Sequence, residues 1–463
     1  MSSDISKPVI EIKSSFGLSK LMVKTLASAA IIGSLLVLSA ISNQAHAQYV
    51  SDDMRTKLAP NFKLDKVVVL MRHGVRPQTN TKKLEENTGR QWPKWIVPDG
   101  FLTGHGYAGI VQQSHYILDT WRAEGLPIAN GCPTSKDYFL WASPVQRTVA
   151  TAQAVGDGMF PGCGIAPQHL ELETDDPLFQ AVDLELAQPD PKIVEQQVLA
   201  AMGGSPEAAE KKYADDVARL RAAVCGDKSD DCKFLDEKWG FKSEKPGKYK
   251  LTGPVSAGST IAETIRLQYS EGLPLENVAF GNVKNSDDVA KLMVLHAAKY
   301  DLVSNTKEIA THGGHVLMGQ ILNALAAGTA DQKTNTYDRL NAPLVVFVGH
   351  DTNISQIQTI VDANWHLGNY PANDIPPGGM LIFKRYYDDV NKVYAINVSF
   401  TARSLDQWRN LTELNGDNAP LSQDFGNESC IKDKEQQLCR LDQFIERNNA
   451  QIQQFEHKID LYK

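Results

Sequence analysis

A cluster of positive charge directly follows an apolar run near residue 70. Val67 to Met71 are five consecutive apolar residues, a pattern typical of a buried strand. Arg72 and His73 come next, and Arg76 follows three residues after His73. Cationic side chains gathered at the end of a buried strand repel one another unless an anion lies among them. The stretch therefore indicates an anion-binding site.

Two later strand ends carry side chains of the same kind. The strand predicted over residues 138–142 leads into a helix whose first turns contain Arg147. The strand predicted over residues 344–348 is followed closely by His350 and Asp351. In an open α/β sheet, ligands bind beyond the carboxyl ends of parallel strands. If these strands are parallel neighbours, we expect their charged residues to converge on one ligand.

A helix predicted to begin near Thr352 adds a further attraction for an anion. Thr352 and Asn353 are expected to cap this helix, whose positive end then points toward the cluster. Such a site suits a compact anion with several charges, and phosphate fits best. The planar guanidinium of arginine can bind a phosphate through two parallel hydrogen bonds.

Two residues of the set have the chemistry for transferring a phosphoryl group. Like charges around His73 lower its pKa, which keeps one ring nitrogen free to attack. Asp351 is suited to protonate the departing oxygen. A phosphate-binding protein without catalysis would need the arginines but not Asp351, so the aspartate argues against that alternative.

The elements that must hold these residues alternate between strands and helices at both ends of the chain. This order predicts an α/β fold, with a mostly parallel sheet sandwiched by helices and an inserted, mainly helical domain. We expect residues 48–185 and 306–463 to form the α/β catalytic domain and residues 186–305 the helical domain. The segments MLIFKRYY and YAINVSF predict a hairpin near the end of the sheet.

The first 47 residues have the pattern of an export signal. Lysines precede an apolar run from Thr25 to Ile41, and Ala45-His46-Ala47 follows it. This predicts a cleavable signal peptide over residues 1–47 and a periplasmic location, with secretion as the alternative. An uncleaved membrane anchor is the competing interpretation, and Met22 is a second possible start.

The overall charge limits the partners. The chain has 463 residues and a formal net charge of −8. An acidic chain without a basic run argues against nucleic acid and against an anionic membrane surface as partners. We expect a small phosphorylated substrate, no membrane contact in the mature form, and a monomer.

All six cysteines follow the predicted signal. An even number in an exported chain is typical of disulfides, and six cysteines allow fifteen pairings. Proximity along the chain favours Cys132 with Cys163, Cys225 with Cys232 and Cys430 with Cys439. A cysteine metal site is disfavoured, because the chain has no C-x-x-C motif.

At this point the motifs resemble a known family. RHGVRPQT together with the distant GHDTN resembles the histidine acid phosphatases, whose pattern is RHGxRxP with a downstream HD. Pro77 falls one position early in this chain. Further segments, including LTGPVSAGSTIAETIRLQ, LHAAKYDL and PPGGMLIF, resemble the bacterial periplasmic branch that contains phytases and glucose-1-phosphatases. The resemblance covers nearly all of the chain after the signal and implies a phosphoglycerate mutase-like fold.

The resemblance also implies roles for individual residues. It makes His73 the nucleophile that becomes a phosphohistidine, and Asp351 the proton donor. The implied phosphate-binding residues are Arg72, Arg76, Arg147 and His350. The implied residues on the substrate side are Thr79, Glu263, His296 and Tyr300, for which capping, surface or helix-face roles are the alternatives. The same three disulfides are implied. No cofactor and no metal is implied; the HGGH segment at residues 312–315 is a poor metal frame, because it contains two glycines.

The choice of substrate lies between two relatives. GVRPQT resembles the phytase-type sequence more, so we expect an exported acid phosphomonoesterase acting on phytate, that is myo-inositol hexakisphosphate. Glucose-1-phosphatase or a broad-specificity acid phosphatase is the alternative. Gly74 is expected to allow a large ligand to approach the backbone, and Thr79 to contact a second phosphate. Asn80 replaces a lysine of phytase-like relatives, with Lys82 and Lys83 slightly further on. A cytosolic mutase of the wider superfamily is disfavoured by the export signal and the HD motif.

Overall fold

The computed structural model covers most of the chain after the predicted signal. It describes residues 62–227, 231–245, 247–333, 337–426, 430–433, 436–455 and 461–462. The predicted signal peptide, residues 1–47, lies outside the described residues. Within the described ranges, no helix has the length and apolar character needed to cross a membrane.

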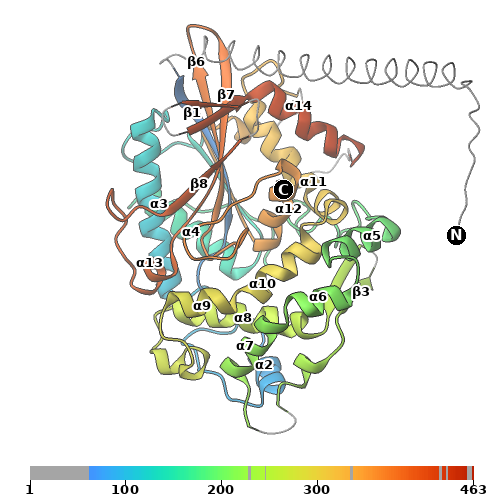
Figure 1. The fold of residues 1–463 in the computed structure, drawn as a ribbon. Coiled ribbons are helices and arrows are strands. Elements are labelled where there is room, and N and C mark those ends of the chain that lie inside the picture. Colours follow the sequence, from blue (N-terminus) through green and yellow to red (C-terminus); the bar gives the residue numbers. More distant parts are fainter. Residues whose placement is uncertain are drawn as a thin grey trace, which may run out of the picture. The chain divides into compact units, whose positions relative to one another are not determined.

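An eight-stranded sheet forms the centre of the fold (Figure 1). Its strands follow the order β2-β5-β1-β6-β7-β10-β9, and β8 also pairs with β7. The strands are β1 (Phe62–Arg72), β2 (Tyr138–Ala142), β5 (Leu344–Gly349), β6 (Met380–Asp388), β7 (Val393–Ala402), β8 (Leu421–Phe425), β9 (Ile431–Asp433) and β10 (Gln436–Arg440). The three strands predicted to end at the site are therefore adjacent, in the order β2-β5-β1.

The α/β class is confirmed, but the sheet is mixed rather than mostly parallel. Only β1 with β5 and β2 with β5 pair in parallel among the described strands. The predicted hairpin is β6 and β7, joined by the short turn at residues 389–392, and β6 then lies antiparallel to β1. A connection this short reverses the chain, so these strands can pair only in the antiparallel direction.

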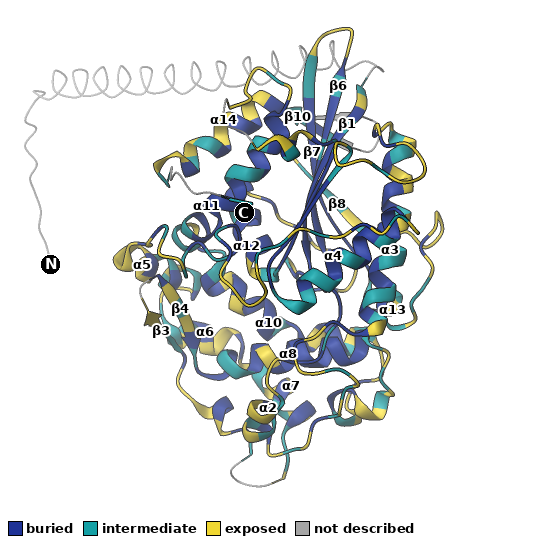
Figure 2. Cartoon of the chain, turned by 180° about the vertical axis from the view of Figure 1, so that it is seen from behind, coloured by how far each residue is buried: buried dark blue, intermediate teal, exposed yellow. Residues whose placement is uncertain are grey.

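Helices cover both faces of this sheet. On one face α3 and α4 pack together and against β1, β2 and β5, while α11, α12 and α14 lie on the other face (Figure 1). These helices are α3 (Gly104–Glu124), α4 (Gln146–Met159), α11 (Lys307–Ala326), α12 (Asp351–Val361) and α14 (Leu441–Ile452). The central strands are dark blue in Figure 2, and Val67 to Leu70 of β1 are almost fully buried. A strand covered on both faces needs a continuous apolar run, as β1 has.

The segment between α4 and α11 is mainly helical, as the sequence predicted. Its helices are α5 (Pro191–Ala201), α6 (Pro206–Lys212), α7 (Ala214–Val224), α8 (Pro254–Ser270), α9 (Ser286–Leu292), α10 (Val294–Lys299) and a π-helical turn at Tyr300–Ser304. It also contains the hairpin of β3 (Gly240–Lys245) and β4 (Lys248–Thr252). The remaining α-helices are α2 (Thr81–Thr88) and α13 (Leu405–Arg409). Residues from Pro60 onward form one compact unit, and the division into two domains stays a prediction.

Three disulfides join the six cysteines in the predicted pairs. They are Cys132–Cys163, Cys225–Cys232 and Cys430–Cys439. Disulfides persist in oxidising compartments, so these bonds fit an exported protein.

Candidate functional site

The three predicted strand ends meet at one edge of the sheet. Arg72 pairs with Gly349 in the parallel register of β1 and β5. Just beyond the strand, the backbone N–H of His73 donates to the carbonyl of Gly349 at 3.1 Å. Ser143, which follows β2, donates its N–H to Val348 at 2.9 Å. Because parallel neighbours end at the same edge, the residues that follow them share one space.

His73 is buried with one ring nitrogen directed at its arginine neighbour. Its Nδ1 lies 2.9 Å from the carbonyl oxygen of Gly74. A carbonyl oxygen only accepts hydrogen bonds, so Nδ1 carries the proton and Nε2 keeps its lone pair. Nε2 lies 3.5 Å from Nε of Arg76. Burial, followed by the charges of Arg76 and Arg147, lowers the pKa of His73 well below its usual value. The neutral ring can therefore act as a nucleophile.

The guanidiniums of Arg76 and Arg147 have no carboxylate partner among the described residues. Arg147 lies in the first turn of α4, as expected. Burial lowers the pKa of Arg76 to about 10 and also lowers that of Arg147. Both remain charged at physiological pH, since even a pKa near 10 lies well above it. Two half-buried cations beside His73 favour a bound anion.

Arg72 differs, because the protein already supplies its counter-charges. Its Nη2 forms ion pairs with Glu263 of α8 and, at 3.2 Å, with Asp351. Its Nη1 donates to the carbonyl of Ile375 at 2.5 Å. Burial alone would lower the pKa of Arg72, but Glu263 and Asp351 raise it above its usual value. Arg72 is thus held rigidly at the end of β1.

Asp351 is the first residue of α12, so the N-cap lies two residues before Thr352, the first residue of the predicted cap pair. The N-cap is His350, whose N–H donates to the side chain of Asn353 at 3.0 Å. The expected cap pair of Thr352 and Asn353 is therefore wrong in register, because Asn353 caps from inside the first turn. Asp351 and His350 therefore both lie at the start of α12, where free backbone N–H groups favour a bound anion.

The electrostatic state of this pair follows from their neighbours. Burial would raise the pKa of Asp351, but Arg72 and then Lys299 hold it well below its usual value. Burial and the charge of Arg147 lower the pKa of His350 to about 3. The ring centroids of His73 and His350 are 5.7 Å apart. The site therefore contains two neutral imidazoles side by side.

A buried network behind Glu263 was not predicted from the sequence. Arg266, one turn after Glu263 on α8, pairs with Glu263 and, at 2.6 Å, with Asp374. The side chains of Arg266 and Asp374 are fully buried. Burial would raise the pKa of Glu263, but Arg266 and Arg72 lower it to about 2. The i, i+3 spacing of Glu263 and Arg266 was the available signal, whereas Asp374 is distant in sequence.

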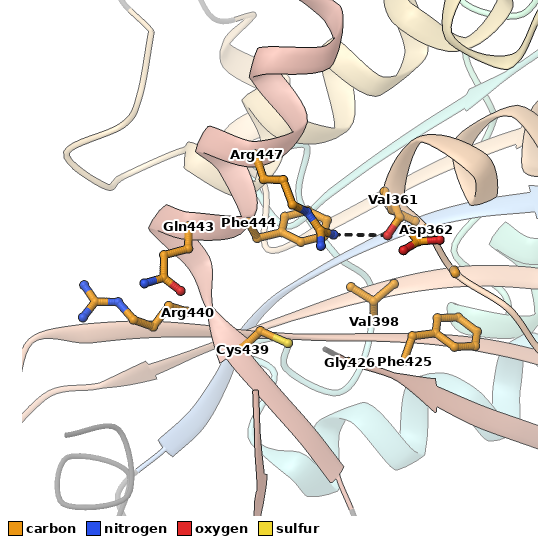
Figure 3. A pocket seen from close by; sticks show the side chains of 11 residues that line it. Val361, Asp362, Val398, Phe425, Gly426, Cys439, Arg440, Gln443, Phe444 and Arg447 are labelled. Atoms are coloured by element: carbon orange, nitrogen blue, oxygen red, sulfur yellow. Dashed lines mark hydrogen bonds between the residues drawn. The ribbon is translucent and has the colours of Figure 1, made fainter. Parts of the chain in front are cut away.

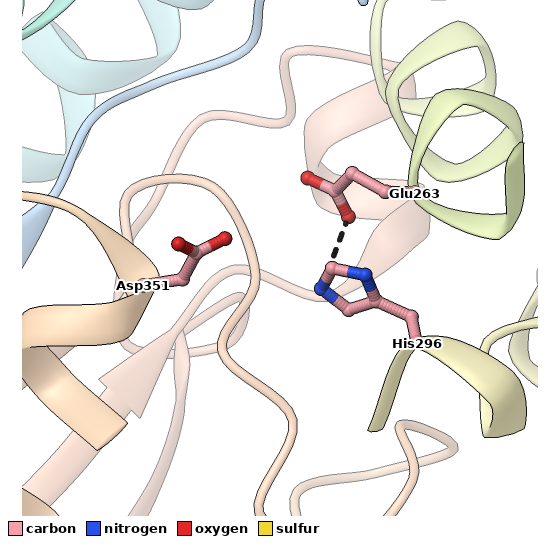
Figure 4. Close-up of side chains that lie close together, drawn as sticks. All are labelled: Glu263, His296 and Asp351. Atoms are coloured by element: carbon pink, nitrogen blue, oxygen red, sulfur yellow. Dashed lines mark ion pairs between the residues drawn. The ribbon is translucent and has the colours of Figure 1, made fainter. Parts of the chain in front are cut away.

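Glu263, His296 and Asp351 come together from three helices (Figure 4). The dashed line in Figure 4 joins Glu263 and His296, whose Oε2 and Nε2 are 3.6 Å apart. Burial lowers the pKa of His296 to about 4, so at neutral pH its ring is uncharged. The three residues could hold a metal ion by proximity. Their two carboxylates, however, already face the guanidiniums of Arg72 and Arg266, which disfavours a cation there.

One pocket brings together the predicted substrate-side residues. Its lining includes all four of these, Thr79, Glu263, His296 and Tyr300, together with Arg76 and Asp351. Burial and Asp351 raise the pKa of Tyr300 well above its usual value. The lining also contains residues that the sequence analysis did not single out, namely Gln78, Ser259, Thr260, Thr264 and Lys299. Lys299 could have been found from its spacing, because His296, Lys299 and Tyr300 share one helix face.

Two residues near His73 have structural roles that the sequence did not reveal. A Cβ at Gly74 would lie 2.9 Å from Leu102 and 3.1 Å from Ile110. Gly74 is thus required for packing, and its expected role in ligand approach is not supported. Asn80 is the N-cap of α2, and its side chain accepts from the N–H of Lys83.

A second pocket of about 290 Å³ lies beside α14, apart from these residues (Figure 3). Val361, Val398 and Phe444 contribute apolar surface, and Arg447 donates to the carbonyl of Val361 across it. None of the residues predicted for the site lines it. The chemistry described above therefore belongs to the pocket at the strand ends.

Curated relatives cover most of this chain. The chain is 30% identical over 407 residues to a phytase of Escherichia coli, covering 85% of this chain and 93% of the relative. It is 29% identical over 405 residues to a glucose-1-phosphatase of Salmonella typhimurium, with coverages of 85% and 91%. A glucose-1-phosphatase of Providencia rettgeri is 31% identical, with coverages of 80% and 88%.

Solved structures and a sequence profile point the same way. The phytase of Klebsiella sp. ASR1 superposes with a TM-score of 0.79 at 32% identity, covering 87% of this chain and 99% of that one. A Hafnia alvei phytase in complex with myo-inositol hexakis sulphate superposes with a TM-score of 0.75 at 27% identity, with coverages of 85% and 98%. The profile of the Histidine phosphatase superfamily (branch 2) matches residues 63–401. The chain therefore belongs to branch 2 of the histidine phosphatase superfamily and is a histidine-type acid phosphatase.

Proposed function

We propose that this acid phosphatase is a phytase that removes phosphate from myo-inositol hexakisphosphate through a phosphohistidine at His73. The observation that carries the choice of substrate is the composition of the pocket. Every described side chain that lines it is polar or charged, and five of them bear a hydroxyl group, namely Thr79, Ser259, Thr260, Thr264 and Tyr300. A ring with phosphate on every carbon offers hydrogen-bond acceptors in all directions, which such a lining can satisfy.

In the first step, Nε2 of His73 attacks the phosphorus of the bound ester. Arg76, Arg147 and His350 hold the phosphate oxygens, and Arg72 adds its fixed charge. As the N–P bond forms, the bond from phosphorus to the ester oxygen breaks, and Asp351 gives its proton to that oxygen. The products are the phosphohistidine, the alcohol and the Asp351 carboxylate.

In the second step, water attacks the phosphorus of the phosphohistidine. The Asp351 carboxylate accepts a proton from this water, and the N–P bond breaks. Inorganic phosphate leaves and His73 returns to its neutral form. The same residue thus acts as acid and then as base, as microscopic reversibility requires.

Asp351 must be protonated for the first step, although Arg72 and Lys299 favour its carboxylate in the free enzyme. The substrate resolves this conflict. A bound phosphate dianion offsets the arginine charges and places like charge beside Asp351, and both effects raise its pKa. The proton donor is therefore formed by substrate binding, and most readily at acid pH.

The test compares kcat/KM of the purified protein for phytate and for glucose 1-phosphate at acid pH. We expect a preference for phytate. A tenfold preference for glucose 1-phosphate would instead assign the enzyme to the second candidate, a glucose-1-phosphatase, which the relatives from Salmonella typhimurium and Providencia rettgeri support.

We also infer a periplasmic enzyme that is monomeric and loses residues 1–47 on export. Three disulfides support export. N-terminal sequencing of the protein recovered from the periplasm should begin at Gln48.

A further inference from the structure

Lys299 is a cation at the pocket that the mechanism above does not use for transfer. It is the last residue of α10, where the chain passes into the π-helical turn. Single π-helical turns often occur at functional sites, because they change which residues share a helix face. His296, Lys299 and Tyr300 all line the pocket. His296 and Tyr300 are buried, whereas Lys299 is exposed.

The ammonium group of Lys299 is available for a ligand. Its Nζ lies 5.4 Å from the centroid of the Tyr300 ring. In the described part of the chain, no ion pair or hydrogen bond involves this ammonium group. Its charge acts on the reaction centre, because Lys299 is, after Arg72, the charged group that most lowers the pKa of Asp351.

The lysines that follow Asn80 in the sequence lie outside the pocket lining. Lys82 and Lys83 lie on α2 and both pair with Glu86, at 3.8 and 4.0 Å. Neither lines the pocket. Asn80, at the position where phytase-like relatives carry lysine, is occupied as the cap of α2. Among the described residues, Lys299 is thus the one lysine in the pocket lining.

The cations at the site form two groups. Arg76 and Arg147 lie beside His73 and serve the phosphate that is transferred. Lys299 comes from a different element, the end of α10, and is solvent-exposed, as is Thr79 in the same lining. A monophosphate ester needs only the first group. A substrate with several phosphates places a second one away from His73, where a cation lowers its energy.

Building on the proposed function, we propose that Lys299 binds a second phosphate group of a polyphosphorylated substrate and so selects inositol polyphosphates over monophosphate esters.

The test separates binding of a polyanion from binding of a single phosphate. Hydrolysis of p-nitrophenyl phosphate is inhibited with myo-inositol hexakissulfate and, separately, with inorganic phosphate, in the wild type and in Lys299→Met. Methionine keeps the length of the side chain and favours helix, so α10 should persist. We expect the inhibition constant of the hexakissulfate to rise about tenfold, the lower end for the loss of one charged hydrogen bond because Lys299 is solvent-exposed, while that of phosphate stays within about twofold.

Two controls sharpen the result. Lys82→Met removes the same charge from outside the pocket lining and should leave both inhibition constants unchanged. Lys299→Arg keeps the charge and should restore tight binding of the hexakissulfate. The inference is overturned if Lys299→Met weakens both inhibitors equally or neither, or if the hexakissulfate binds the wild type no more tightly than phosphate does.

These measurements do not depend on which ester the enzyme prefers. If the wild type prefers glucose 1-phosphate but Lys299→Met still weakens only the hexakissulfate, the phytase proposal fails and the role of Lys299 stands. If phytate is preferred but the variant binds hexakissulfate normally, the phytase proposal stands and Lys299 has no part in selection.

Discussion

Replacing Asp351 by asparagine removes one proton and one charge with little change of shape. Oδ1 of Asp351 accepts from the N–H of Thr352 at 2.9 Å, and an asparagine Oδ1 can do the same. The start of α12 should therefore persist. What is lost is the proton for the leaving oxygen and the negative charge 3.2 Å from Arg72.

The two losses should change phosphoenzyme formation and phosphate binding in opposite directions. General acid catalysis contributes about 10²- to 10⁴-fold, or about 3–5 kcal/mol, and the rate of phosphoenzyme formation from an alkyl phosphate should fall by that factor. p-Nitrophenolate leaves readily without a proton, so phosphoenzyme formation from p-nitrophenyl phosphate should slow by no more than about tenfold. The free Asp351 carboxylate repels a phosphate held by Arg76 and Arg147. For unit charges about 6 Å apart at an effective dielectric constant of about 20, this repulsion is at most about 2.8 kcal/mol.

Inorganic phosphate should consequently inhibit the variant up to roughly a hundredfold more strongly than the wild type, where Asp351 is ionised. The assay measures the rate of the first turnover for both esters, before the phosphohistidine is hydrolysed, and the inhibition constant of phosphate as a function of pH. In the wild type, phosphoenzyme formation from the alkyl phosphate is fastest below the pKa of Asp351 in the substrate complex and slows as pH rises through it. This decline should vanish in the variant. Equal slowing of the first turnover on the two esters, or weaker binding of phosphate, would refute the acid role.

Three further predictions test other parts of the site. His73→Ala should abolish turnover and the formation of an acid-labile phosphoenzyme, and appreciable residual activity would contradict the assignment of His73 as the nucleophile. Arg266→Met should lower the free energy of unfolding in urea by about 3–5 kcal/mol, because it leaves Asp374 buried without its partner; adding Asp374→Asn should recover part of this loss, and a loss below about 1 kcal/mol would contradict the argument. EDTA should leave activity unchanged, because Glu263 and Asp351 already pair with arginines; inhibition reversed by a divalent ion would count against this.

The strand ends could be predicted because their signals are local. The charged groups lie at or soon after the ends of apolar runs, as Arg72 ends β1 and His73 follows it. The pairing of neighbouring cysteines was accessible for the same reason. The proportion of antiparallel strands could not be predicted. The hairpin of β6 and β7 is local, but the pairing of β6 with β1 depends on residues far apart in the chain, such as Leu70 and Leu381.

The roles of residues that depend on a partner distant in the chain could not be predicted from the sequence. Arg266 has a helical spacing to Glu263 that is common on any exposed helix, and only Asp374, 108 residues later, shows that this face is buried. Gly74 looked like an opening for a ligand, and only the positions of Leu102 and Ile110 show that it is a packing contact. Asn80 likewise looked like a missing cation until its bond to Lys83 identified a helix cap.

The carboxylates that pair with the arginines explain why this cluster of charges is stable, and the explanation differs from the one that the sequence suggested. The sequence suggested that a ligand alone cancels the arginines. In the structure, Glu263 lies between Arg72 and Arg266, and Asp351 and Asp374 each pair with one of these two. These two guanidiniums are therefore compensated by protein carboxylates, which makes the end of β1 rigid before substrate arrives. Arg76 and Arg147 remain for the phosphate, and their two charges match those of one dianion. The site can thus fold without its ligand and still bind it strongly.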